Sequence, residues 1–224
     1  MCGRFAVDID EDTLTEVFEL VHVPPLRSSW NVAPTQSAPV ILDSVKRGGW
    51  TVEPFRWGLI PRWARDESGG ARLINARSET VHTKPAFRAA FAARRCLVPV
   101  SGFYEWAATG SGKQPWYFAH PNGAPLALAG LWERWRDAAG EPVHTFCIIT
   151  CAPNDVVRPV HARMPAILPA EAWPRWLDAQ TEPEIDELRA LLAPCPVDVL
   201  TGHRVSRAVN SPRNDGAELI APID

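Results

Sequence analysis

The spacing of apolar positions along the chain predicts many short strands with a few helices inserted between them. Apolar residues recur every three or four positions from Leu14 to Val21, which is typical of an amphipathic helix, and Asp10 or Asp12 can cap its first turn. Further helices are predicted at residues 85–94, with Thr83 as the cap, and at residues 171–177 and 184–192.

The remaining apolar runs alternate with polar residues or are β-branched, and Gly and Pro interrupt them, which is typical of strands joined by tight turns. They include WTVEPFRW, RRCLVPV, GFYEW, QPWYFAH, APLALAGLWERW and VHTFCIIT, and short final strands are predicted in PVDVLTG and RVSRAV. Because helices do not alternate regularly with strands, a doubly wound sheet is disfavoured. The pattern predicts the α+β class with a mixed or barrel-like sheet, in a single domain over residues 1–224.

Composition supports a packed globule with many rigid turns, because the chain holds 22 prolines and 10 tryptophans. No apolar run approaches the ~18–20 residues that a membrane helix needs. The first residues, MCGRFAVDIDED, lack an apolar signal core and turn acidic at once. We therefore expect a cytoplasmic protein that does not enter membranes.

Charge is unevenly distributed along the chain. The net charge is −3, yet the window from Arg56 to Arg95 carries +6 and the remainder carries −9. A local basic zone on an acidic body can bind a few phosphates without coating duplex DNA indiscriminately. The alternative is a compositional preference for arginine, so charge alone gives DNA binding weak support.

The cysteines argue against a disulfide framework and against a metal site. There are five, an odd number, without a secretory context. Cys147 and Cys151 fall on the same face of a predicted strand, and His and Cys do not occur near them at zinc-finger spacing. Neither a metal nor another cofactor is expected.

Several polar residues stand where the pattern favours apolar ones. Glu105 lies among three aromatics in GFYEW, where desolvation would raise its pKa toward neutrality and suit a general acid or base. A solvent-facing carboxylate, or one paired with Arg77 or Arg163, is an equally good interpretation. Asn75 follows an apolar pair in LINARSET, and His161 lies between a Pro-marked turn and an apolar run.

Cys2 is the most informative residue. If Met1 is removed, the chain begins with a 1,2-aminothiol, whose amine has a pKa near ~7.7–8.0 and whose thiol has a pKa near ~8.5. Such a group condenses with an aldehyde, first as a Schiff base and then as a five-membered thiazolidine, which only a terminal Cys can form. The alternative is that Cys2 is an accidental second residue.

Several motifs occur together in one order: MCGRFA, WNVAPTQ, WGLIPRW, LINARSET followed by KPAFR, RRCLVPVSGFYEW, HARMPAIL and VSRAVNSPRNDGAEL. From Met1 to about Leu219 the chain resembles the SOS-response-associated peptidase family, also called abasic-site processing proteins. The resemblance implies an α+β domain with a curved β core and a basic DNA channel. It also implies recognition of abasic sites in single-stranded DNA and a thiazolidine crosslink through the processed N-terminal Cys, with some lyase activity.

The resemblance also implies roles for particular residues. The family's catalytic motif positions match Cys2, Asn75, Glu105 and His161. Phosphate contacts are expected from Arg4 and Arg77, supported by Lys84 or Arg88 and by Arg163, and Trp63 is expected to stack on a base. Some relatives have a second aromatic where this chain has Ala64, and an Arg near the position of Pro85, so the strand wedge and that phosphate contact are weakened here.

Two other functions share parts of this pattern. An N-terminal-nucleophile peptidase or amidase would also use Cys2, but it would need a peptide groove and an oxyanion hole. A non-covalent single-stranded DNA-binding module would leave Cys2 inert. For the whole chain we expect a monomer whose partner is single-stranded DNA with abasic sites, and which associates with the nucleoid when bound to DNA.

Overall fold

In the computed structural model, which describes residues 2–110, 112–181 and 184–223, five strands close into a barrel. They are β3 (Ser37–Ser44), β4 (Gly49–Trp57), β6 (Arg95–Val100), β9 (Leu126–Arg136) and β10 (Pro142–Cys151). Strand β10 closes the ring because it pairs in parallel with β4 on one edge and antiparallel with β9 on the other. The short strands β5 (Asn75–Arg77) and β11 (Met164–Pro165) extend this sheet along β10. The predicted barrel-like mixed sheet is confirmed.

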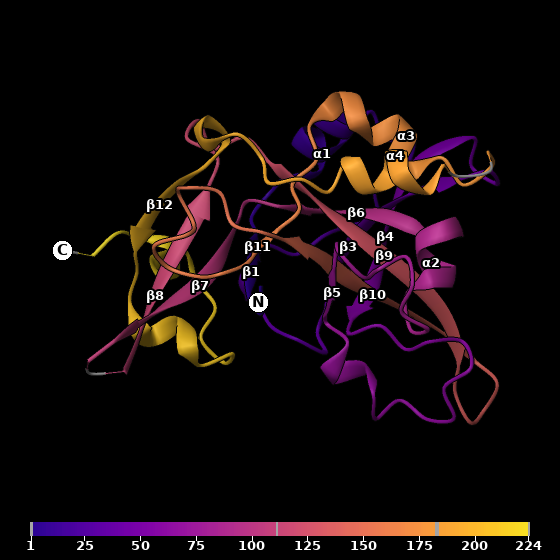
Figure 1. Cartoon of the computed structure of the whole chain (residues 1–224), viewed down its shortest axis with the longest axis horizontal. Helices are drawn as coiled ribbons and strands as arrows, with labels where there is room; N and C mark the ends of the chain where they lie inside the picture. Colours follow the sequence, from indigo (N-terminus) through magenta and orange to yellow (C-terminus); the bar gives the residue numbers. More distant parts are fainter. Residues whose placement is uncertain (1, 111, 182–183, 224) are drawn as a thin grey trace.

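A second, antiparallel sheet packs beside the barrel (Figure 1). Its order is β12-β8-β7-β1-β2, with bounds β12 (Thr201–Arg204), β8 (Gly112–Ala119), β7 (Gly102–Thr109), β1 (Phe5–Val7) and β2 (Ser29–Val32). The ring centroids of Phe5 and Trp57 lie 4.7 Å apart, and Trp57 also stacks on Phe146 of β10. Burial of these aromatics joins the first strand of the chain to the barrel and fixes the position of Cys2, which precedes β1.

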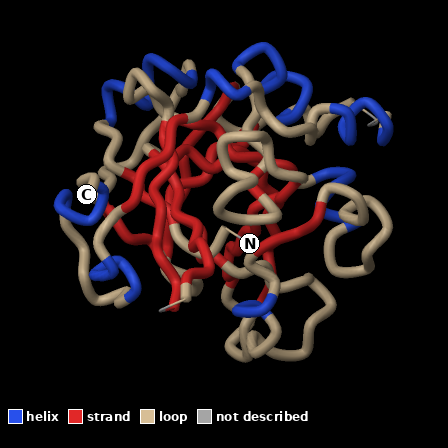
Figure 2. The backbone as a smooth tube through the Cα atoms, turned by 60° about the vertical axis from the view of Figure 1, so that its left-hand side comes forward, coloured by secondary structure: helices blue, strands red, loops and turns tan. Residues whose placement is uncertain are grey.

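Four short α-helices of the described residues lie at the periphery of the strands (Figure 2), and the predicted α+β class is confirmed. They are α1 (Glu11–Phe18), α2 (Arg88–Ala93), α3 (Trp173–Leu177) and α4 (Ile185–Ala190). Asp10 caps α1 as predicted, because its carboxylate accepts a 2.7 Å hydrogen bond from the Thr13 amide. Within the described residues, no helix is long and apolar enough to cross a membrane.

Several elements differ from the predictions. In PVDVLTG, predicted as a strand, Val197–Val199 form a 3₁₀ turn and strand β12 begins only at Thr201. Helix α1 ends before Val21, because Glu19 adopts a left-handed conformation with φ 51°. Helix α2 begins only at Arg88, and the Thr83 hydroxyl donates to the Thr80 carbonyl within a preceding turn instead of capping the helix. The predicted last strand, RVSRAV, is largely a 3₁₀ turn at Arg207–Asn210, which begins where the Ser206 hydroxyl accepts a hydrogen bond from the Ala208 amide.

The loop between β4 and β5 is held against the barrel at Gly58. Its amide donates to the Phe146 carbonyl at 2.8 Å, and its φ of 122° lies in the region that favours glycine. A Cβ at this position would lie 2.8 Å from the carbonyl oxygen of Gly70, so the two ends of the loop approach too closely for a side chain. The loop that carries Trp63 therefore starts from a fixed point.

Candidate active site and nucleic-acid interface

Asn75 connects the barrel to the start of the chain. It lies on β5, whose pairing with β10 places it opposite Ile148, and its Nδ2 donates a 2.7 Å hydrogen bond to the carbonyl oxygen of Cys2. Its Oδ1 is buried and accepts no hydrogen bond from the described residues. A buried acceptor without a donor is costly, so this oxygen is available to a bound group.

Glu105 enters the site from the second sheet. The three residues before it on β7 are buried, and its own side chain is also buried, at 2% exposure. Burial raises the pKa of Glu105 to about 7, so the carboxyl is poised to exchange a proton near neutral pH. The sequence-based interpretation of Glu105 as a desolvated carboxyl is confirmed, and the alternative of a solvent-facing strand residue is wrong.

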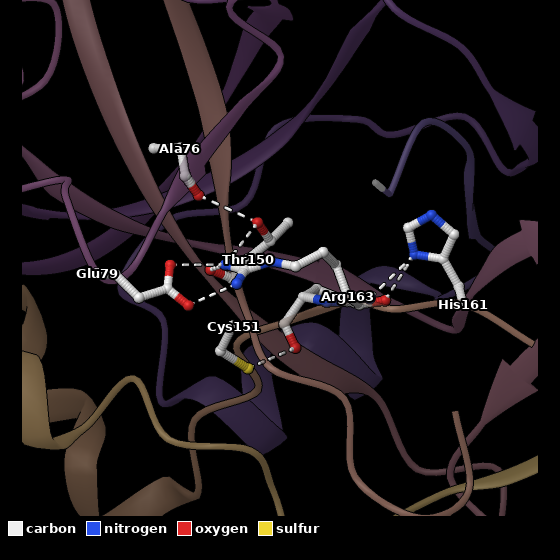
Figure 3. A network of polar contacts seen from close by, with 7 residues as sticks. Ala76, Glu79, Thr150, Cys151, His161 and Arg163 are labelled. Atoms are coloured by element: carbon white, nitrogen blue, oxygen red, sulfur yellow. Dashed lines mark hydrogen bonds and ion pairs between the residues drawn. The ribbon is translucent and has the colours of Figure 1, made fainter. Parts of the chain in front are cut away.

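His161 faces Glu105 from the turn before β11. Its Nδ1 lies 3.6 Å from Oε1 of Glu105. The backbone of Arg163 brackets the same nitrogen, with its amide nitrogen at 3.1 Å and its carbonyl oxygen at 3.0 Å (Figure 3). Partial burial lowers the pKa of His161, which favours the neutral ring. A neutral imidazole next to a carboxyl of raised pKa can pass a proton in either direction.

The thiol of Cys2 is fully buried and protonated. Burial raises its pKa well above the ordinary value, and the nearby negative charge of Glu105 raises it further. Its Sγ donates weakly to the Arg4 carbonyl at 3.9 Å. Cys2 is therefore close to both Asn75 and Glu105, and the four residues singled out in the sequence form one cluster.

A pocket of about 390 Å³ opens beside this cluster. It is lined by Glu105, Trp106, Lys113, His161 and Asn210. Trp106 Nε1 donates a 2.8 Å hydrogen bond to Oδ1 of Asn210, which joins β7 to the 3₁₀ turn near the C-terminus. No role was predicted for these three residues: Trp106, Lys113 and Asn210. Trp106 lies in GFYEW and Asn210 in VSRAVNSPRNDGAEL, whereas no pattern in the sequence marks Lys113.

The guanidinium group of Arg163 forms an ion pair and a hydrogen bond within the protein. Its guanidinium forms a two-pronged pair with Glu79, at 2.5 Å and 3.0 Å, and donates to the Thr150 carbonyl (Figure 3). This network ties the His161 turn to β10. Arg163 therefore positions His161, and its predicted phosphate contact would have to compete with Glu79.

Arg4 is also held by the protein. Its guanidinium donates to Oδ1 of Asn31 at 2.6 Å and to the Val209 carbonyl at 2.7 Å. The Nδ2 of Asn31 donates in turn to the carbonyls of Ser211 and Asn214. Asn31 thus organises the C-terminal turn, a role that sequence reasoning missed although Asn31 lies in the WNVAPTQ motif.

The other predicted DNA-contacting residues are exposed. Arg77 lies on β5 two residues from Asn75, Lys84 lies in the following turn, and Arg88 starts α2. Trp63 is 69% exposed, which is unusual for so large an aromatic side chain. Of these four, the structure places only Arg77 on a strand that also carries a residue of the cluster. Within the described part of the chain, His, Cys, Asp and Glu do not gather in groups of three that could hold a metal ion.

The fold and site define a class of mixed-barrel α+β proteins in which a buried cysteine at the second position meets an Asn, a Glu and a His from three other segments. The chain belongs to the SOS response associated peptidase (SRAP) family, whose profile matches residues 1–212.

Named relatives match nearly the full length. "Abasic site processing protein YoaM" of Bacillus subtilis is 39% identical over 225 residues, covering 98% of this chain and 97% of the relative. "Abasic site processing protein HMCES" of Gallus gallus is 32% identical, covering 100% and 78%. A crystal structure from Bordetella bronchiseptica superposes with a TM-score of 0.80 at 29% identity, covering 92% and 100%. One from Bacteroides thetaiotaomicron gives 0.76 at 30% identity, covering 87% and 85%.

Proposed function

We propose that this protein captures abasic sites in single-stranded DNA by forming a covalent bond to its own N-terminal Cys2 after Met1 has been removed. The names of the relatives support the substrate. The convergence of Asn75, Glu105 and His161 on Cys2 is the observation that carries the proposal, because it surrounds the one possible aminothiol with groups that can move protons.

The first step opens the sugar. An abasic deoxyribose is mostly a closed hemiacetal, and opening it requires loss of the proton on the C1 hydroxyl and gain of a proton on the ring oxygen. Neutral His161 and Glu105 lie 3.6 Å apart, and together they supply one acceptor and one donor. The product is a free aldehyde within reach of the chain terminus.

The second step forms a Schiff base. The Cys2 amine attacks the aldehyde carbon, and the carbinolamine then loses its hydroxyl as water, leaving a C=N bond. Glu105 takes a proton from the attacking amine and returns one to the departing hydroxyl, a double role that suits a carboxyl with a pKa of about 7. The unpaired Oδ1 of Asn75 can hold the amine or a sugar hydroxyl during the exchange.

The third step closes the thiazolidine ring. The Cys2 sulfur adds to the imine carbon, the thiol proton passes to the imine nitrogen, and no atom is lost. Because the thiol is buried and protonated, it attacks only after the aldehyde has been bound next to it. Schiff-base chemistry beside a proton acceptor also permits β-elimination, so some nicking of the DNA strand accompanies the crosslink.

A denaturing gel tests the proposal directly. Purified protein, with Met1 removal established by intact mass, is mixed with a single strand carrying one abasic site. A shifted band that survives denaturation is expected from the native protein and from Cys195→Ala, which removes a different buried thiol, but not from Cys2→Ala. An adduct mapped by mass spectrometry to any other residue, or turnover of peptides with no DNA adduct, would overturn the proposal, the latter in favour of an N-terminal-nucleophile peptidase.

A further inference from the structure

A second pocket lies along the barrel, on the part of β9 that runs past the end of β6. The last β6 partner of β9 is Leu131, opposite Arg95, so residues 132–136 pair only with β10 among the strands described. The pocket measures about 430 Å³, and its lining is four arginines, two tryptophans and an alanine: Arg62, Ala64, Arg94, Trp132, Arg134, Trp135 and Arg136. We call it the arginine pocket.

The charge of the arginine pocket is only partly neutralised. Arg94 donates a 2.8 Å hydrogen bond to Glu133, whose side chain is turned into the protein and is 3% exposed. Arg62, Arg134 and Arg136 are exposed, and the pocket lining itself contains no carboxylate among the described residues. A concave surface with this excess of guanidinium groups attracts anions, and the planar guanidinium fork matches phosphate oxygens.

Contacts within the protein hold the two tryptophans of the pocket, Trp132 and Trp135, in place. Trp135 Nε1 donates a 2.8 Å hydrogen bond to the carbonyl oxygen of Ala64, which fastens the loop between β4 and β5 to the pocket. Trp132 packs against Phe55 and against His144, with ring centroids 5.7 Å and 6.1 Å away. Trp63 lies in the chain between Arg62 and Ala64, which both line the pocket, and its side chain is exposed.

The strand register connects the arginine pocket to the cluster around Cys2. Arg134 is paired with His144 of β10, and Asn75 is paired with Ile148 four residues further along the same strand. Four residues of a strand span ~13 Å. Because His144 and Ile148 differ by an even number of positions, their paired neighbours lie on the same side of the sheet. A DNA strand attached at Cys2 needs only a few nucleotides to reach the pocket.

We propose that the arginine pocket binds backbone phosphates of the DNA strand that flanks the abasic site, while a neighbouring base stacks on Trp63. The inference rests on the proposed function and adds to it a second contact region, distinct from the residues that surround Cys2. An interleaved set of arginines and tryptophans favours a nucleic acid strand over an acidic peptide, because the aromatic faces and the guanidinium groups match alternating bases and phosphates.

The test measures how oligonucleotides of two lengths bind to a double variant of the pocket and to a control double variant. Arg134→Ala with Arg136→Ala removes two exposed charges from the pocket, and Arg27→Ala with Lys46→Ala removes two exposed charges elsewhere as a matched control. All proteins also carry Cys2→Ala, so that binding stays reversible. Affinity is measured by fluorescence anisotropy over a salt series for strands of about 20 and about 3 nucleotides centred on a stable abasic analogue.

For the long strand, loss of two phosphate contacts is expected to reduce the slope of log affinity against log salt by about 1.4 and to weaken binding roughly tenfold near 0.1 M salt. Binding of the short strand and the melting temperature should not change. If the long strand binds the double variant as tightly as it binds the control, or if the variant loses only affinity for free inorganic phosphate or a mononucleotide, the inference is wrong. The proposed function is judged separately: the double variant with Cys2 intact should still crosslink the short strand.

Discussion

The Nδ2 atom of Asn75 lies 2.7 Å from the carbonyl oxygen of Cys2, and this hydrogen bond joins two residues that are 73 positions apart in the chain. It fixes the backbone of Cys2 from the barrel side, because β5 is itself held to β10 by parallel pairing. The terminal segment of a chain is ordinarily poorly ordered unless something ties it down. Here the tie is the side chain of Asn75, which also takes part in the proposed mechanism.

We expect Asn75→Ala to slow crosslinking by about 5-fold to 150-fold, since one buried hydrogen bond is worth ~1–3 kcal/mol when a partner is left unpaired. Single-turnover crosslinking to an abasic strand measures the rate. Asn75→Asp should also slow crosslinking, because it retains the size and the acceptor but lacks the Nδ2 donor to the Cys2 carbonyl. A rate for Asn75→Ala equal to that of the native protein would show that Asn75 plays no part.

The raised pKa of Glu105 predicts how the free energy of unfolding depends on pH. Its pKa is raised from about 4.5 in the unfolded chain to about 7 in the folded protein, so the folded state holds the proton more tightly between these values. The folded protein therefore loses stability relative to the unfolded chain as the pH rises from about 4.5 to about 7. The effect on the free energy of unfolding is on the order of 3 kcal/mol.

Glu105→Gln removes this titration. We expect the native protein to become less stable relative to the variant across that pH range, with no further change attributable to this residue above pH ~8. Urea unfolding of both proteins at several pH values measures the difference. The variant should also crosslink more slowly, because an amide cannot exchange a proton. Parallel stability curves, or an unchanged crosslinking rate, would contradict the assignment of Glu105 as a desolvated acid and base.

Arg163 is expected to act by positioning His161 and not as a phosphate ligand. Arg163→Lys keeps the charge but loses the two-pronged pair with Glu79, so it should lower the melting temperature and slow crosslinking. Arg163→Gln, which removes the charge, should leave the salt dependence of reversible DNA binding unchanged, whereas Arg77→Gln, at an exposed position on β5, should reduce its slope by about 0.7. If Arg163→Gln reduced the slope as much as Arg77→Gln, Arg163 would be a phosphate contact after all.

The sequence singled out Cys2, Asn75, Glu105 and His161, which the structure places in one cluster, but it did not predict their surroundings. Glu105 stands out in the sequence because burying a charged carboxylate among three aromatic residues costs free energy. Such a residue is therefore either neutral, paired or part of a functional site. The barrel was foreseeable only as a class, because its closure depends on β10 pairing with β4 and β9, which are far apart in the sequence. No local sequence pattern indicates which distant strands will pair.

The contacts that the sequence did not predict also depend on residues far apart in the chain. The pair between Arg163 and Glu79 joins residues 84 positions apart, and the pattern around each one is equally consistent with a solvated side chain. Lys113 lines the pocket only because β8 folds back on β7. Helix ends were misplaced by a few residues where local hydrogen bonds, such as that from Thr83 to Thr80, competed with a cap.

A substitution at Trp63 is expected to change DNA binding with little effect on the stability of the fold. Its side chain is 69% exposed, so Trp63→Ala removes little buried surface and should change the free energy of unfolding by less than ~0.5 kcal/mol. A base that stacks on an aromatic ring contributes ~1–3 kcal/mol, so reversible affinity for single-stranded DNA should fall by about 5-fold to 150-fold. Trp63→Phe, which keeps an aromatic face, should recover much of the loss, and anisotropy titrations of the three proteins measure it. An alanine variant that binds like the native protein would show that the exposed indole does not contact the strand, and the DNA path would then have to run along Arg77 without it.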